Sequence, residues 1–228
     1  MIGVVDYGAG NLGSVMNALE RLGIEARFAK GPEELSLASS GGKRGANLEG
    51  GAVKNGAARG GSPFDSIIFP GDGHFATAME ALDKSGYSQA IREWIAADRP
   101  FFGICIGLQL LFESSEEAPG VAGLGILPGT VKRFPGRKVP QIGWNQAEAR
   151  PGSTLFSGLP PNPFFYFIHS FYAAPSLDSD VAADTEYDLR YCSAVERGAL
   201  AAVQFHPEKS GQVGLDLIKN RLGGKHAR

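Results

Sequence analysis

Residues 2–28 of the chain, IGVVDYGAGNLGSVMNALERLGIEARF, decide the fold class. They begin with a short apolar run at residues 2–5 and end with a run at residues 24–28 in which apolar and polar residues alternate. Between these runs, apolar residues recur at helical spacing over residues 12–22, and Gly23 follows as a stop signal. The order strand, helix, strand predicts the start of a parallel α/β sheet.

The same alternation continues through the first half of the chain. Apolar strands are predicted at residues 66–69 and 101–104, and helices at residues 75–82, 87–97 and 105–112. After Pro119 the pattern predicts short strands, at residues 129–134, 143–149, 164–172, 181–186, 192–196 and 200–205. A closing helix is predicted at residues 212–222, with Ser210 as its N-cap. We therefore expect a three-layer α/β fold: a mostly parallel central sheet with helices on both faces, plus a smaller antiparallel sheet in the second half.

Length and composition limit the kind of protein. The 228 residues suit one domain, so residues 1–228 are expected to form a single domain. The 22 Lys and Arg residues nearly balance the 24 Asp and Glu residues, which argues against binding nucleic acid or an anionic membrane by bulk charge. The start of the chain does not resemble a signal peptide, and no apolar run reaches about 18 residues. Two cysteines, Cys105 and Cys192, are compatible with a reducing compartment, so a cytoplasmic protein is expected.

One segment, residues 41–61, fits no element of this fold. Eight of its 21 residues are glycine and it has no apolar period, so burial cannot offset the entropy cost of ordering it. We expect a mobile surface insertion between the second and third strands. A nucleic-acid-binding arm is the alternative, but the four basic residues are few and no aromatic residue lies among them for stacking.

The strongest chemical motif is Gly103-Ile104-Cys105-Ile106-Gly107, at the junction of a predicted strand and a predicted helix. It matches the nucleophile elbow Gly-x-nucleophile-x-Gly, with cysteine as the nucleophile. In such a turn the central residue has a strained backbone, and the flanking positions have room only for glycine. The start of the following helix favours the thiolate, and the amide of Ile106 points to where an oxyanion would form. The alternative is that Cys105 is a small buried hydrophobic residue.

A cysteine nucleophile needs a base, and His206 is the best placed of the four histidines. It ends an apolar strand at residues 200–205, where Pro207 stops strand pairing. Glu208 lies two residues further on, so in an extended chain its side chain projects to the same side and can orient the imidazole. Because α/β folds bind ligands at the ends of parallel strands, a Cys105–His206–Glu208 triad is favoured. The alternative is that His206, Pro207 and Glu208 are simply polar residues that end the strand and have no chemical role.

A glycine-rich turn, Pro70-Gly71-Asp72-Gly73, follows another apolar strand. Such turns allow backbone amides to approach a ligand closely. A phosphate-binding loop is excluded, because no Gly-Lys-Ser/Thr follows and the Asp72 carboxylate would repel phosphate. We therefore expect this turn to supply a second amide for an oxyanion.

These pieces, in this order, resemble the class I, or triad, glutamine amidotransferase domain. The resemblance covers the chain except residues 41–61, and it is carried by residues 6–11 (DYGAGN), 70–75 (PGDGHF), 103–116 (GICIGLQLLFESSE), 141–145 (QIGWN), 166–170 (YFIHS) and 204–210 (QFHPEKS). The elbow and the His-Pro-Glu motif are shared by the class. The first motif, the Gly-Trp-Asn segment and Lys209 are similar to the glutaminase subunits of histidine biosynthesis.

The resemblance implies that the chain hydrolyses glutamine to glutamate and ammonia. Cys105 would attack the side-chain amide carbon, His206 would move the proton and Glu208 would position His206. A γ-glutamyl thioester would form and water would then hydrolyse it. The resemblance implies no cofactor and no metal.

The resemblance also implies which residues bind the substrate. The amides of Asp72 and Ile106 would hold the oxyanion. Glutamine would contact Gly73, Gln109, Glu117 and the backbone of Ser170 and Phe171. The chain departs from the family at Asp72, where valine is common, and an acidic side chain there lies close to a developing negative charge.

A protein partner is implied as well. Ammonia is mostly protonated in neutral water and is then not nucleophilic, so a glutaminase must pass it through a dry route to the enzyme that uses it. In the histidine branch that enzyme is a (βα)8-barrel cyclase, which makes a heterodimer. Asn11, Trp144, Tyr166 and Lys209 match positions at that interface, and the glutaminase alone is expected to be poorly active.

Three alternatives remain. The chain resembles other amidotransferases of the class, which serve anthranilate or pyridoxal phosphate synthesis. A catalytically silent regulatory module could keep the same fold. A Cys-His peptidase could use the same scaffold, and it would be indifferent to glutamine.

Overall fold

The structure is a computed structural model that describes residues 1–8, 12–36, 61–136 and 138–223. Its helices are α1 (Leu12–Arg21), α2 (Phe75–Ser85), α3 (Tyr87–Ala96), α4 (Ile106–Gln109) and α5 (Gly211–Leu222), with short 3-10 turns η1 (Pro32–Leu35), η2 (Asp178–Asp180) and η3 (Pro207–Lys209). Its strands are β1 (Ile2–Val4), β2 (Ala26–Phe28), β3 (Ser66–Phe69), β4 (Phe101–Ile104), β5 (Ser114–Ser115), β6 (Gly129–Arg133), β7 (Gln141–Gln146), β8 (Glu148–Ala149), β9 (Phe164–His169), β10 (Phe171–Pro175), β11 (Val181–Tyr187), β12 (Leu189–Arg197) and β13 (Leu200–Val203).

Most strands join one sheet, which changes character along its width. The order starts β2-β1-β3-β4-β13, and every neighbouring pair in this part is parallel. It continues β12-β10-β6-β5, where β13–β12, β12–β10 and β10–β6 are antiparallel, while β11 and β8 extend from β12. The parallel strands β3, β4 and β13 end at the same edge of the sheet, and the glycine-rich turn, the elbow and His206 directly follow them.

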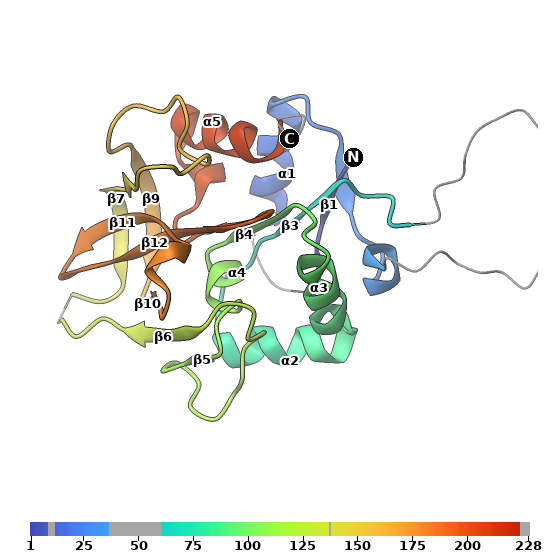
Figure 1. The fold of residues 1–228 in the computed structure, drawn as a ribbon, viewed down its shortest axis with the longest axis horizontal. Helices are drawn as coiled ribbons and strands as arrows, with labels where there is room; N and C mark the ends of the chain where they lie inside the picture. Colours follow the sequence, from blue (N-terminus) through green and yellow to red (C-terminus); the bar gives the residue numbers. More distant parts are fainter. Residues whose placement is uncertain (9–11, 37–60, 137, 224–228) are drawn as a thin grey trace, which may run out of the picture.

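Helices cover both faces of the parallel part, so the predicted three-layer α/β fold is confirmed. The helices α2 and α3 lie on one side of the sheet, and α1 and α5 lie on the other (Figure 1). Alternate strand residues separate the two cores: Ile67 and Phe69 pack with α2 and α3, and Ile68 packs with α1 and α5.

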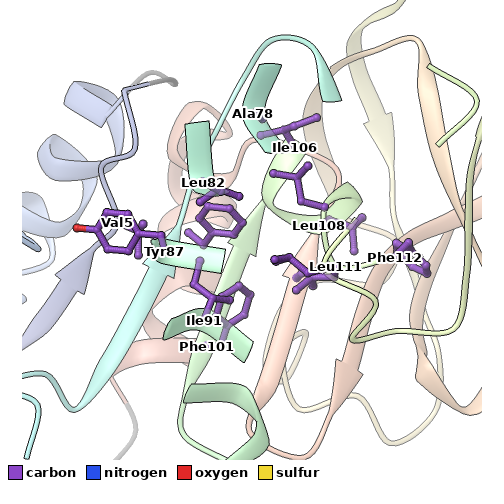
Figure 2. Close-up of a cluster of buried hydrophobic side chains, with 14 of the residues drawn as sticks. Val5, Ala78, Leu82, Tyr87, Ile91, Phe101, Ile106, Leu108, Leu111 and Phe112 are labelled. Carbon is purple, nitrogen blue, oxygen red and sulfur yellow. The ribbon is translucent and has the colours of Figure 1, made fainter. Parts of the chain in front are cut away.

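The core beneath the elbow is densely aromatic and aliphatic. In Figure 2, Leu82, Tyr87 and Ile91 from α2 and α3 gather near Phe101 of β4, and Ile106 of α4 lies at the end of the same cluster. All five side chains are buried, and burying a large apolar side chain contributes about 1.5–3 kcal/mol. The backbone on either side of Cys105 is therefore anchored in packed structure.

A separate two-stranded sheet, β7–β9, lies beside the main sheet. The prediction of one strand over residues 164–172 is wrong, because the chain changes sheet at Ser170. The strand before Ser170, β9, pairs with β7, and the strand after it, β10, pairs with β6 and β12. Ser170 therefore lies at the junction between the two sheets.

The predicted helix over residues 105–112 is also too long, because α4 ends at Gln109. Carbonyls of residues 110–112 accept hydrogen bonds from the amides of residues 124–127 instead of continuing a helix. Leu108, Leu110, Leu111 and Phe112 are all fully buried, so this segment buries side chains in every direction rather than along one helical stripe.

Two further expectations concern residues outside this description. Asn11 and residues 41–60 of the glycine-rich insertion lie outside the described residues. Within the described ranges, the helices are too short or too polar to cross a membrane.

Candidate active site

Cys105 stands at the turn between β4 and α4 in a strained backbone conformation. Its φ is +57° and its ψ is −108°, a region that residues with a side chain rarely adopt. A Cβ atom on Gly107 would lie 2.0 Å from the carbonyl oxygen of Phe69, and one on Gly103 would lie 2.8 Å from the carbonyl oxygen of Gly107. The two glycines are therefore required by close backbone packing, as the elbow motif predicts.

His206 and Glu208 form a buried pair. His206 Nδ1 lies 2.8 Å from Glu208 Oε1, and both side chains are almost fully buried. The other ring nitrogen, Nε2, is buried with no hydrogen-bond partner of ordinary geometry among the described residues. Burial by itself lowers the pKa of His206, but the nearby Cys105 and Glu208 outweigh burial and raise the pKa above its usual range. The site is thus built to keep a proton on this ring when the sulfur and the carboxylate are charged.

A pocket of about 350 Å³ brings most of the predicted site residues together. Its lining contains these predicted residues: Cys105, His206, Asp72, Ile106, Gly73, Gln109, Glu117, Ser170, Phe171 and Lys209. Pro140, Ile168 and His169 complete the lining and were not predicted. Glu208 lies behind His206 and does not line this pocket, and Trp144 and Tyr166 lie apart from it on the β7–β9 sheet.

Gln109 and a second glutamine, Gln204, form a buried amide pair beside the sulfur. Gln109 Nε2 donates to the carbonyl oxygen of Phe171 at 3.1 Å and to Gln204 Oε1 at 3.0 Å. Gln204 Nε2 in turn donates to Cys105 Sγ at 3.8 Å. Gln109 is thus left with its oxygen, an acceptor, as the group that can meet a ligand in the pocket.

His169 is a second buried histidine on the pocket wall, but its surroundings are neutral. Its Nδ1 lies 2.7 Å from the carbonyl oxygen of Phe171, and its Nε2 lies 3.2 Å from the hydroxyl of Tyr191. Burial is the main cause that lowers the pKa of His169 to about 4; the Phe171 carbonyl acts in the opposite direction, and the nearby His206 adds a smaller lowering effect. Neutral His169 therefore donates through Nδ1–H to the same carbonyl that Gln109 contacts.

The glycine-rich turn contributes Asp72 and Gly73 to the pocket lining. Gly71 is wedged between the hydroxyl of Tyr7 and the side chain of Ile106, and a Cβ atom there would lie 2.1 Å from each. Gly73 has a φ of +94°, which favours glycine. Next to the turn, Glu117 Oε2 accepts the backbone N–H of Phe75 at 2.8 Å, which fixes this carboxylate at the pocket edge.

Ser210 has a different role from the predicted one. It occupies the N-cap position of α5, but its hydroxyl makes no capping hydrogen bond. The hydroxyl donates to the carbonyl oxygen of His206 at 2.6 Å and accepts from the backbone N–H of Tyr166 at 3.0 Å. The backbone N–H of His206 also donates to the carbonyl oxygen of Tyr166 at 2.9 Å. Ser210 therefore ties the segment that carries the base to strand β9.

Comparison with known families agrees with this geometry. The family model described as glutamine amidotransferase class-I matches residues 4–222. The chain belongs to the class I glutamine amidotransferase family. Within it, the chain is 41% identical over 223 residues to the imidazole glycerol phosphate synthase subunit HisH of Chlorobaculum tepidum, which covers 96% of this chain and 98% of that one. It is 44% identical over 221 residues to the subunit of the same name from Moorella thermoacetica, covering 96% of this chain and 92% of that one.

Solved structures place this amidotransferase in the same fold. A crystal structure of a glutamine amidotransferase matches with a TM-score of 0.67 at 21% identity, covering 96% of this chain and 98% of that one. The structure of PurLQS from Thermotoga maritima matches with a TM-score of 0.66 at 18% identity, covering 97% of each chain. At these identities the likeness shows the fold alone.

The sequence interpretation assigned no role to four polar residues of this amidotransferase: Tyr7, His169, Tyr191 and Gln204. The signal that marks three of them is a polar group inside an apolar run, because buried polar groups need partners. Gln204 stands in the run 200–205, and Tyr191 and His169 stand in or beside strands with alternating apolar residues. In the described part of the chain, no group of three or more His, Cys, Asp or Glu side chains is placed to hold a metal ion.

Proposed function

We propose that this chain hydrolyses glutamine through a Cys105 thioester and is the glutaminase subunit of imidazole glycerol phosphate synthase, in histidine biosynthesis. The observation that carries the proposal is the strained elbow that holds Cys105 in a pocket with the buried His206–Glu208 pair. Relatives named as that synthase's HisH subunit, at 41% and 44% identity over nearly the whole chain, support it.

In the proposed reaction, His206 takes the proton of the Cys105 thiol, and the sulfur attacks the amide carbon of glutamine. The carbon–nitrogen bond then breaks, His206 returns the proton to the leaving ammonia, and a γ-glutamyl thioester remains. Water attacks the thioester, with His206 accepting its proton, and glutamate leaves as the thiol forms again. Glu208 holds the ring and stabilises its charged form throughout.

The oxyanion of both tetrahedral intermediates needs donors, and two backbone amides are the candidates. Ile106 is the first residue of α4, so its amide has no acceptor within the helix. Asp72 lies in the glycine-rich turn on the pocket wall, and its amide rather than its side chain is proposed to act. Removing one such donor in hydrolases costs about 10²–10³ in rate.

Substrate recognition follows from the charges and orientations of the lining. The carboxylate of Glu117 is proposed to bind the α-ammonium group of glutamine. The free oxygen of Gln109 is an acceptor, which suits the NH₂ group of the side-chain amide and not the carboxylate of glutamate. Gly73 and the backbone of Ser170 and Phe171 supply the remaining contacts.

The outer face of β7–β9 is proposed to bind the partner. Ile142, Trp144, Phe164 and Ile168 are 60%, 56%, 52% and 41% exposed, and Trp144 pairs with Tyr166 across the two strands. A contiguous apolar surface of this kind marks protein interfaces. Ile168 also lines the pocket, as does Lys209, so the pocket borders this face. A short route for ammonia from Cys105 into the partner follows from that continuity.

The proposed partner is a (βα)8-barrel cyclase that uses ammonia to make imidazole glycerol phosphate, in a cytoplasmic heterodimer. Trp144→Ala should weaken binding of this cyclase about 10–100-fold, since exposed tryptophans often dominate interfaces. The matched control is Leu177→Ala, because Leu177 is 48% exposed but lies outside the β7–β9 face. Equal affinities for both variants would place the interface elsewhere.

The decisive experiment on function separates the two half-reactions. Cys105→Ala, mixed with the cyclase, should lose glutamine-dependent turnover while turnover with added ammonium salt persists. Loss of both activities, in a variant that still binds the cyclase, would contradict the division of labour. Stimulation by an anthranilate or pyridoxal phosphate synthase instead of the cyclase would contradict the choice of partner.

A further inference from the structure

Gln204 is a fully buried polar residue in an apolar strand end, and no step of the proposed reaction uses it. It is 0% exposed, and it lies next to the elbow because Val203 of β13 is paired with Ile104 of β4. Its own N–H donates to the carbonyl oxygen of Ser193 at 2.9 Å, and the N–H of Cys105 donates to the carbonyl oxygen of Val203 at 2.8 Å. Backbone hydrogen bonds therefore hold both Gln204 and Cys105 in place just beyond the ends of β13 and β4.

The orientation of the Gln204 amide follows from a chain of contacts that starts at a carbonyl. The carbonyl oxygen of Phe171 can only accept, so the Gln109 atom 3.1 Å away must be the nitrogen. The second hydrogen of that nitrogen points to Gln204 at 3.0 Å, so the Gln204 atom there must be the oxygen. The remaining end of Gln204, 3.8 Å from Cys105 Sγ, is then the NH₂ group. The sulfur faces a donor, and the alternative placement of the amide would break two hydrogen bonds.

The starting carbonyl is itself fixed from another side. His169 donates to the Phe171 carbonyl at 2.7 Å through Nδ1–H, and the hydroxyl oxygen of Tyr191 lies 3.2 Å from the opposite ring nitrogen. The Tyr191 hydroxyl donates to Gln141 Oε1 at 2.9 Å. Every group in this chain is buried, so water cannot readily replace any of the contacts.

Gln204 and His206 both lie close to Cys105 in the segment that directly follows β13. Cys105 is in contact with Gln204 and is the group that most raises the proton affinity of His206. The sulfur is thus placed between an amide donor and the imidazole.

We propose that Gln204 is a further catalytic residue: its side-chain N–H groups donate to Cys105 Sγ, stabilise the thiolate and fix the direction of the sulfur. Gln109 and His169 are positioning residues for this donor, because they set which end of the amide faces Cys105. The proposal rests on Cys105 being the nucleophile of the proposed function. A donor to a thiolate is worth more than one to a thiol, since hydrogen bonds to charged groups are about twice as strong.

A merely structural role for Gln204 makes a different prediction. In that case Gln204 only satisfies Gln109, and its replacement changes stability without changing the ionisation of the sulfur. Gln204→Met separates the two roles, because it keeps the side-chain length and removes the donor to the sulfur without adding a charge. Gln204→Glu tests only whether this end of the side chain faces Cys105, because a carboxylate there still accepts from Gln109 and turns a negative oxygen toward the sulfur.

The test is the rate of alkylation of Cys105 by iodoacetamide as a function of pH, on the full chain without glutamine or partner. Peptide mass mapping separates the Cys105 adduct from any at Cys192, which is buried. The pH of half-maximal rate should rise by about one unit in Gln204→Met, and further in Gln204→Glu. Ser193→Ala is the matched control, because it removes a fully buried hydroxyl beside Gln204 without touching the sulfur, and its half-maximal pH should equal that of the native chain.

An unchanged half-maximal pH in a folded Gln204→Met variant would overturn the proposal, and so would a shift no larger than that of Ser193→Ala. If Gln204→Met does not fold, as judged by thermal unfolding, Gln204→Leu takes its place, because it also removes the donor without adding a charge. The measurement needs no glutamine hydrolysis. A chain without glutaminase activity would therefore still report whether Gln204 acts on the sulfur.

Discussion

His206 and His169 line the same pocket and are 4% and 6% exposed, yet the pKa of one is raised and the pKa of the other is lowered. His206 faces a carboxylate and a thiol, which raise its pKa above the usual range. His169 faces a carbonyl and a hydroxyl, and burial lowers its pKa to about 4. Equal burial therefore does not decide the charge of a histidine; the charge of its partners does. Of these two histidines in the pocket lining, His206 can carry a proton, whereas neutral His169 orients the groups around it.

The same substitution at both histidines gives the largest expected contrast. His206→Asn should lower the rate of glutamine hydrolysis in the complex with the proposed cyclase by about 10⁴, because no group is left to move the proton. His169→Asn should cost less than about tenfold, because the asparagine nitrogen can replace Nδ1–H as the donor to Phe171. Steady-state kinetics with glutamine and then with ammonium salt separate loss of chemistry from loss of the complex. If the two variants lose comparable activity, the claim that only His206 moves a proton is contradicted.

Glu208→Gln tests why the pKa of His206 is raised. The carboxylate favours the charged ring, so its removal lowers the pKa of His206 and moves the alkaline fall in activity to lower pH. The rate at the optimum should also drop about 10²–10⁴-fold, as when the orienting carboxylate is removed from other triads. The measurement is the pH profile of kcat/KM. Gln212→Leu, at an exposed position, serves as the control, and an alkaline limb that does not move in Glu208→Gln would contradict the assigned cause.

The smallest expected effect is on stability in acid. Folded His169 stays neutral down to about pH 4, whereas in the unfolded chain its pKa returns to its ordinary value of 6.5. Between these values the unfolded state binds more protons, so stability falls as the pH drops from 6.5 towards 4. His169→Asn removes this contribution, which is on the order of 3 kcal/mol in full. Urea unfolding at pH 7 and pH 5 should therefore show a smaller loss of stability for the variant than for the native chain, and an equal loss would mean that His169 is charged when folded.

Local rules in the sequence were sufficient for the parts of the site that depend on neighbouring residues. The elbow glycines follow from the close approach of Gly107 to Phe69. The spacing of His206 and Glu208 predicted their pairing, but the extended chain assumed for it is wrong: Pro207–Lys209 is a 3-10 turn, and this turn brings Glu208 Oε1 to 2.8 Å from His206 Nδ1. These features could be predicted because the residues involved lie within a few positions of one another, or because only glycine fits.

Features that depend on distant partners could not be predicted in the same way. The partners of Gln204 lie 95 and 99 positions away, at Gln109 and Cys105, so a glutamine in an apolar run indicated a need for buried partners but not which partners they are. Ser210 sits at a helix start but donates to His206, because a tertiary contact competes with capping. The helix after Cys105 is short because the carbonyls of residues 110–112 accept hydrogen bonds from the amides of residues 124–127, which only the folded chain brings close.

The most direct test of the central claim, that Cys105 is the nucleophile of a glutaminase, is labelling with an electrophilic glutamine analogue followed by mass mapping. The chain should take up one analogue molecule, attached to Cys105, and the Cys105→Ala variant should take up none. Full labelling of that variant, or an adduct found at Cys192 instead, would contradict the account.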